Sequence, residues 1–134
     1  MHDPRYLKGI AHFNNREFYD AHEIWEELWN EQQGEAHRFL QGLIQFATAL
    51  HHFKAHNLRG TRILYDGGVK LLKPYGESYW DLPLTKLIED MSQCVKPLLT
   101  FPQDELPGRS HPDKESFPVQ IQSDLIPKIE LLPS

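Results

Sequence analysis

The sequence has 134 residues and a mass of 15.7 kDa, the size of a single domain that can bury a core of its own. A mean hydropathy of -0.56 and the lack of a long apolar run exclude a membrane span, and a formal charge of -5 argues against nucleic-acid binding through phosphate contacts. The single cysteine, Cys94, excludes an internal disulfide and favours a reducing, cytoplasmic setting.

The first predicted helix starts at Pro4, has Asp3 as its N-cap, and ends at Asn14 and Asn15. Its side chains expected to point inward are Tyr6, Leu7, Ile10 and Phe13.

A capping box predicts the start of the second helix. Asn14 takes the N-cap position and Glu17 the N3 position, while Phe13 and Phe18 are placed to form a hydrophobic staple. Apolar residues then recur every three or four positions, which extends the helix to about Gln32.

Three further helices are expected over residues 35–56, 58–73 and 83–96. The first of these has the broadest apolar surface, which is typical of the most buried helix of a bundle. In the next one, Gly60 and Gly67 lie seven positions apart, where another backbone could approach closely. The fold class predicted from these segments is a compact all-α bundle of about five helices.

The prolines divide the chain into two parts, since three precede residue 97 and seven follow from Pro97 onward. Because proline interrupts a helix interior, we expect a helical bundle domain over 1–96 and an extended, proline-rich tail over 97–134. The tail contains two short alternating pieces, 117–121 and 129–131. They either pack on the bundle as extended strands or belong to a disordered arm.

Several motifs occur in a fixed order: Phe13-Asn14, Ala21-His22-Glu23 with Trp25 and Trp29, Arg38 with Leu40-Gln41-Gly42-Leu43-Ile44-Gln45, and Asn57-Leu58-Arg59-Gly60. This combination resembles the domain-of-unknown-function family 309, a group of small all-helical proteins. The resemblance implies an all-helical fold. Members are often labelled predicted metal-dependent hydrolases because of the His-Glu step. The proline-rich tail departs from the family pattern.

The candidate catalytic residues are His22, Glu23 and Glu26, which form a His-Glu-x-x-Glu pattern. His22 and Glu26 lie one turn apart on the same edge of a helix, while Glu23 points further out. The spacing resembles a zinc-protease helix whose second histidine is replaced by a carboxylate. A metal ion there needs a third and usually a fourth ligand.

The register of the second and third helices decides which groups can meet His22. If these helices form an antiparallel hairpin about their short connection, His22 lies level with Gln45 and Glu26 lies level with Gln41. His51 then lies about 9 Å along the helix from His22, at a rise of about 1.5 Å per residue, which argues against chelation by this pair. We expect the histidines at this helix end to act as helix-terminal cations favoured by the dipole.

Three interpretations of this cluster follow. The first is a polar network in which His22 and Glu26 contact Gln41 and Gln45 and thereby fix the helix register. The second is a ligand or proton-transfer site that uses His22 with Glu23 or Glu26. The third is a divalent-metal site. The first interpretation is preferred.

Charge is unevenly distributed along the helical part. Residues 15–35 carry seven acidic side chains and one arginine, whereas residues 36–73 carry six basic side chains and one aspartate. Complementary solvated faces of neighbouring helices explain this best. The sharper alternative is an anion site near Arg38, Arg59 and Arg62.

Two functions from different classes remain. The preferred one is a non-catalytic binding or assembly module, whose ligand or polar-network residues include Arg38 and Asn57 beside the two glutamines. The alternative is a metal-dependent hydrolase that uses His22 and its neighbouring carboxylates. No cofactor is identified for certain from the sequence, and a divalent metal is the candidate for the hydrolase. The expected partner is another protein or a small-molecule ligand, not a nucleic acid or a membrane, and a homo-oligomer fits the assembly role. Cys94 lies on an apolar helix face and is expected to be a buried, inert thiol.

Overall fold

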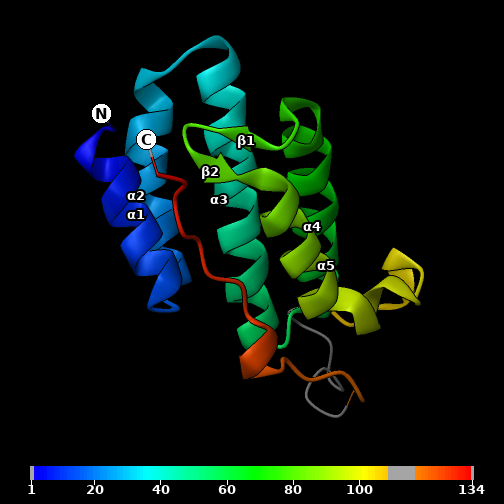
Figure 1. The fold of residues 1–134 in the computed structure, drawn as a ribbon. Helices are drawn as coiled ribbons and strands as arrows, with labels where there is room; N and C mark the ends of the chain where they lie inside the picture. Colours follow the sequence, from blue (N-terminus) through cyan, green and yellow to red (C-terminus); the bar gives the residue numbers. More distant parts are fainter. Residues whose placement is uncertain (1, 109–116, 134) are drawn as a thin grey trace.

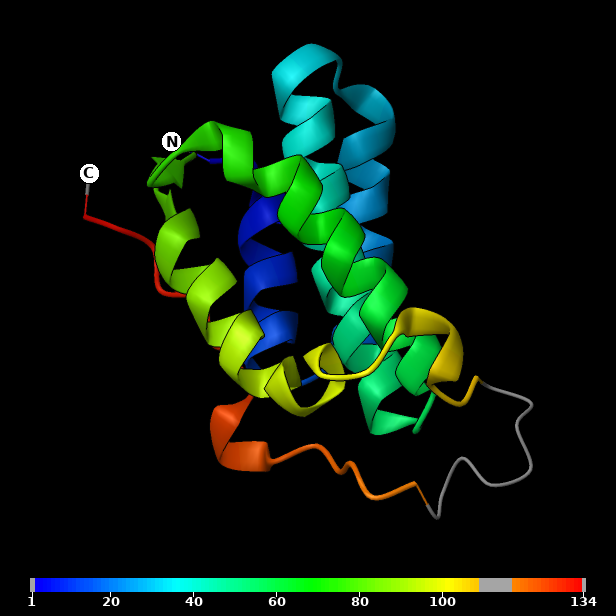
Figure 2. The ribbon, with the colours of Figure 1, turned by 90° about the vertical axis from the view of Figure 1, so that its right-hand side faces the viewer.

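The computed structural model describes residues 2–108 and 117–133 (Figure 1). Its α-helices are α1 (Pro4–Asn14), α2 (Phe18–Glu31), α3 (Gly34–Lys54), α4 (Leu58–Leu72) and α5 (Leu84–Leu99). Helix α3 lies between α2 and α4, α1 packs against α2, and α5 packs against α4 (Figures 1 and 2). The prediction of a bundle of about five helices is confirmed. Within the described ranges, no helix has both the length and the apolar character needed to cross a membrane.

A small sheet adds to the expected all-helical fold. Strands β1 (Ser78–Tyr79) and β2 (Leu82–Pro83) pair antiparallel between α4 and α5. Trp80 and Asp81 connect them with φ angles of 48° and 60°, as a two-residue hairpin turn requires. Before this hairpin, α4 continues into the short 3₁₀ helix η1 (Lys73–Tyr75).

Helix α1 starts as predicted, because Asp3 accepts a hydrogen bond from the backbone N–H of Arg5 at 2.8 Å. One of the four expected inward residues is misplaced, since Leu7 is 44% exposed. The other three are buried: Tyr6, Ile10 and Phe13.

The predicted capping box of α2 is wrong. Asn14 is the last residue of α1, and Glu17, not Asn14, occupies the N-cap position of α2 without a side-chain hydrogen bond. The chain reverses at Arg16, which adopts a left-handed φ of 63° and so delays the helix start to Phe18. Phe13 and Phe18 still meet, with ring centroids 5.2 Å apart in an edge-to-face arrangement.

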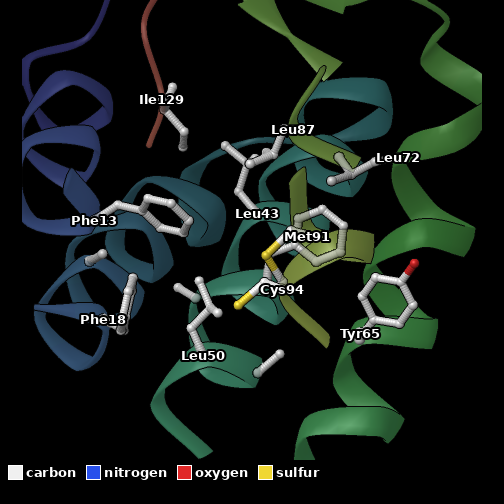
Figure 3. Packing of buried hydrophobic residues seen from close by; sticks show 14 of the residues in the cluster. Phe13, Phe18, Leu43, Leu50, Tyr65, Leu72, Leu87, Met91, Cys94 and Ile129 are labelled. Atoms are coloured by element: carbon white, nitrogen blue, oxygen red, sulfur yellow. The ribbon is translucent and has the colours of Figure 1, made fainter. Parts of the chain in front are cut away.

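Helix α3 is the buried centre of the bundle, as its apolar breadth predicts. Figure 3 shows its Leu43 and Leu50 among side chains from other elements, including Phe13, Leu72 and Met91. The buried residues of α3 are Phe39, Leu40, Gly42, Leu43, Phe46, Ala47, Ala49, Leu50 and Phe53.

Close packing of α4 on α3 explains glycines in both helices. A methyl group at Gly42 would lie 2.5 Å from the Leu72 side chain, and one at Gly67 would lie 2.1 Å from Gln45 Oε1. The expected approach of another backbone is therefore wrong at Gly67, because a side chain fills the space. At Gly60 the neighbour is the side chain of Asn57, which caps the same helix.

Helix α5 continues past its predicted end. Pro97 lies inside the helix, which ends at Leu99. A proline lacks the N–H that a helix interior uses, but in the last turn it removes one hydrogen bond and the chain still completes two more helical residues. Thr100 then donates its hydroxyl to the carbonyl of Pro97.

The described part of the chain after α5 includes two 3₁₀ helices, η2 (Gln103–Glu105) and η3 (Ser123–Leu125). No strand occurs over 117–133, although the buried residues Val119 and Ile129 join the core. Residues 109–116 and Ser134 of the predicted tail lie outside the described residues.

The contact between α1 and α2 makes a testable prediction. A methyl group at Gly9 would lie 2.0 Å from the indole nitrogen of Trp25, and Trp25 is fully buried. We expect Gly9→Ala to lower the free energy of unfolding by about 2–3 kcal/mol, because the indole cannot move without repacking the core. Urea denaturation measures this effect. Gly108→Ala is the control, since nothing lies within 4 Å of its added methyl. Equal stability of the two variants would contradict the packing.

Candidate functional site

A small pocket lies between α2 and α3, around the candidate histidine. We call it the imidazole pocket. Its volume is about 260 Å³, and its lining residues are Tyr19, His22, Thr48, His51 and His52. Tyr19 links the two helices, because its ring centroid lies 5.6 Å from that of His22 and also 5.6 Å from that of His51.

The pairing of α2 with α3 agrees with the residue count from their turn where the structure gives a contact. Trp29 stacks on His37 with ring centroids 4.2 Å apart, and Tyr19 and Thr48, which the count places level, line the same pocket. His22 and His51 both line this pocket, with the Tyr19 ring centroid 5.6 Å from each. The separation of His22 and His51 along the helix stays a prediction.

The two ring nitrogens of His22 have different surroundings. Nε2 lies 3.1 Å from Oε2 of Glu26, and the two side chains are 26% and 49% exposed. Nδ1 is buried and has no hydrogen-bond partner among the described residues. In the neutral ring with its proton on Nε2, facing the carboxylate, Nδ1 is an unpaired acceptor.

The carboxylates of the candidate catalytic set lie outside the pocket. Glu23 is exposed on α2, and Glu26 contacts His22 from a position that is half exposed. Neither residue lines the imidazole pocket. The structure therefore brings His22 and Glu26 together but leaves Glu23 apart.

The predicted contact of His22 with Gln45 is wrong. The Gln45 side chain lies against Gly67 of α4, because the missing side chain of this glycine leaves room for it. Gln41 is partly buried one turn earlier on α3.

The pocket includes two residues that the sequence analysis missed, Tyr19 and Thr48. A signal for Tyr19 was present, since residues three apart on a helix share a face and Tyr19 precedes His22 by three. Tyr19 is also 54% exposed, unusual for a large ring. No sequence pattern marked Thr48 as a pocket residue. In the structure its hydroxyl donates to the carbonyl of Ile44 at 2.8 Å.

The basic residues form anchors rather than the anion site considered above. Arg59 donates to the carbonyls of Asp104 and Leu106. Arg62 pairs with the Asp66 carboxylate at 3.0 Å and donates to the carbonyl oxygens of Leu98 and Phe101. These guanidinium groups hold the chain that follows α5 against α4.

Arg38 and Asn57 also have local partners. Arg38 lies beside the hydroxyl of Tyr75, whose pKa is raised by burial and lowered in part by this cation. Asn57 caps α4 by accepting from the Gly60 N–H, and its amide nitrogen lies 3.2 Å from Nδ1 of His52. Asn57 thus fixes one wall of the imidazole pocket.

A second cluster lies where α1 meets α2. His12, Glu17 and Asp20 each bring one ligand atom to within 4.8 Å of the others. His12 Nδ1 and Glu17 Oε1 are 3.0 Å apart, and the carboxylates are exposed. In residues 2–108 and 117–133, this is the only set of three such side chains that gathers so closely.

Cys94 has the expected surroundings, since it is buried beside Met91 in the core (Figure 3). Burial raises the pKa of its thiol to about 11. At pH 8 only about one thiol in a thousand is then the reactive thiolate.

We therefore expect Cys94 to resist a disulfide exchange reagent in the native protein at pH 8 and to react fully after unfolding in guanidinium. The spectrophotometric yield of released thiolate measures both states. A native reaction as fast as that of a free thiol would contradict the buried position.

Comparisons with known proteins bear on the family. The model of the family described as Domain of unknown function (DUF309) matches residues 6–64. The chain is also 29% identical over 104 residues to the uncharacterized protein YpuF of Bacillus subtilis (strain 168). That match covers 75% of this chain and 60% of the relative, so the chain spans less than two thirds of the relative's length. The resemblance inferred from the motifs is confirmed: residues 6–64 match the domain of unknown function family DUF309.

Proposed function

We propose that this chain is a non-catalytic binding module that holds its ligand in the imidazole pocket. The observation that carries the proposal is the buried Nδ1 of His22, an acceptor without a partner among the described residues, in a side chain that lines this pocket. A buried polar atom left unpaired costs about 1–3 kcal/mol. A ligand that donates a hydrogen bond to Nδ1 recovers this free energy.

The chemistry of the walls indicates the class of ligand. The pocket volume of about 260 Å³ is small beside the roughly 300–1,000 Å³ of sites that enclose drug-sized molecules. The ring of Tyr19 offers a flat surface, and the histidines of α3 offer further polar groups. These features favour a small planar molecule with an N–H or O–H group.

The placement of the carboxylates supports binding rather than catalysis. A general acid–base pair works when both groups reach the reacting atoms. The pocket lining includes imidazole, phenol and hydroxyl groups but neither Glu23 nor Glu26. His22 thus meets its carboxylate partner at the solvent side of α2.

A metal-dependent hydrolase is the second candidate, and one specific observation favours a metal. His12, Glu17 and Asp20 supply one imidazole and two carboxylates within 4.8 Å of one another. Zinc, manganese and ferrous ions accept such mixed ligands. This cluster is separate from the His22, Glu23 and Glu26 set to which the hydrolase alternative was first assigned.

The binding proposal is tested by a titration of the isotope-labelled protein with small planar N–H and O–H donors, followed by NMR of the histidine rings. We expect at least one compound to shift the resonances of His22 and His51 together in a saturable way. His22→Phe should abolish the effect, because it removes the acceptor, and the exposed Glu23→Gln variant should preserve it. Shifts that persist in His22→Phe would contradict the proposed site.

Metal analysis of the purified protein separates the two candidates. The binding module is expected to contain no stoichiometric zinc, manganese or iron, in the wild type or in His22→Ala. The hydrolase candidate requires one bound ion per chain, lost in His12→Ala if the cluster near α1 holds it and in His22→Ala if the original set holds it. A stoichiometric ion that disappears in His22→Ala would overturn the non-catalytic proposal.

A further inference from the structure

The C-terminal segment lies along the bundle between α1 and α5 (Figures 1 and 2). Residues 126–133, here called the docked segment, belong to no helix or strand. Their backbone groups therefore depend on partners elsewhere in the molecule. Ile129 reaches into the core near Phe13 and Leu87 (Figure 3).

Among the described residues, one side chain, that of Asn14, hydrogen-bonds to the main chain of this segment. The Asn14 amide donates from Nδ2 to the carbonyl of Ile129 at 2.8 Å, and its Oδ1 accepts from the Ile129 N–H at 2.7 Å. The Leu132 N–H donates to the carbonyl of Asp81 at 2.7 Å. These contacts recognise an extended backbone and not the identity of its side chains.

The side chains of the docked segment alternate in burial. Pro127 and Ile129 are buried and Leu131 is partly buried, whereas Lys128 and Glu130 are exposed. This period of two is the pattern of an extended chain with one face bound. The docked segment thus places an apolar residue in the groove at every second position.

The groove is larger than the segment within it. A cleft of about 820 Å³ remains between the docked segment and α5, lined in part by Lys86, Leu87 and Asp90. Asn14 lies in the range 6–64 that matches the family, while the docked segment lies outside this range. The backbone-binding residue therefore belongs to the family domain, and the segment that it binds does not.

We propose that the groove between α1 and α5 is a binding site for an extended peptide with apolar residues at alternate positions, and that the docked segment occupies it as a displaceable ligand in cis. Asn14 is the residue that holds the peptide backbone. The partner is another polypeptide whose extended segment competes with residues 126–133. This site is separate from the imidazole pocket. The peptide-binding proposal does not depend on the function proposed for that pocket.

The test uses the full chain and a fluorescent peptide with the sequence of residues 122–133. In the wild type the docked segment competes at an effective concentration of the order of millimolar, so the added peptide binds weakly. Ile129→Asp weakens the docked segment by placing a charge in an apolar site. We expect this variant to bind the peptide about tenfold more tightly or better, as measured by fluorescence anisotropy.

The role of Asn14 is tested in the Ile129→Asp background. Asn14→Ala should reduce peptide affinity by about tenfold, because both backbone hydrogen bonds are lost. Asn15→Ala is the matched control, since Asn15 is exposed, and it should leave the affinity unchanged. Equal affinities of the Asn14 and Asn15 variants would overturn the assignment.

Circular dichroism verifies that each variant is folded, and Ile129→Ala replaces Ile129→Asp if the aspartate prevents folding. The wild type gives a measurement that needs no variant. Excess unlabelled peptide should move the amide NMR signals of Ile129 and Leu132 in the protein to disordered-chain positions. Signals that stay unchanged at saturating peptide, or folded Ile129 variants that bind no better than the wild type, would overturn the proposal.

Discussion

The burial of α3 between α2 and α4 is the constraint on which the rest of the structure depends. Apolar side chains of α3 pack against α2 on one side and against α4 on the other. Trp25 of α2 is fully buried in the same core. Large aromatic side chains lose much of their burial energy when displaced, so they fix which residues of α2 and α3 meet. The imidazole pocket is a consequence, because Thr48, His51 and His52 lie on the part of α3 that this packing turns toward Tyr19 and His22.

The features predicted correctly from the sequence are those with local causes. Asp3 marks the start of α1 because its cap involves a neighbouring residue, and the spacing of apolar residues marks α3 for the same reason. The spacing of Asn14 and Glu17 matched a helix cap. The true partner of the Asn14 side chain, Ile129, is 115 positions away and leaves no local signal in the sequence. The count from the turn agrees with the pairs Trp29–His37 and Tyr19–Thr48, whereas the contact of Gln45 with Gly67 depends on α4 and could not be found from the α2–α3 hairpin alone.

The chemistry-bearing residues are divided between two faces of the part of the chain that matches the family model. The pocket residues Tyr19, His22 and His51 and the groove residue Asn14 all fall within the matched range 6–64. The side chains of Asn14, Arg59 and Arg62 donate hydrogen bonds to backbone carbonyls and so hold the chain that follows α5 against this part of the structure. This part of the chain therefore presents fixed polar groups, and the described residues of the C-terminal part contact some of them but do not line the imidazole pocket.

The account depends most directly on the pairing of α2 with α3 around Tyr19. Nuclear Overhauser effects between side chains in the native protein test this pairing. The account predicts cross-peaks from the Tyr19 ring to the rings of both His22 and His51. Cross-peaks from the His22 ring to the side-chain amides of Gln41 and Gln45, without contact between Tyr19 and His51, would contradict it.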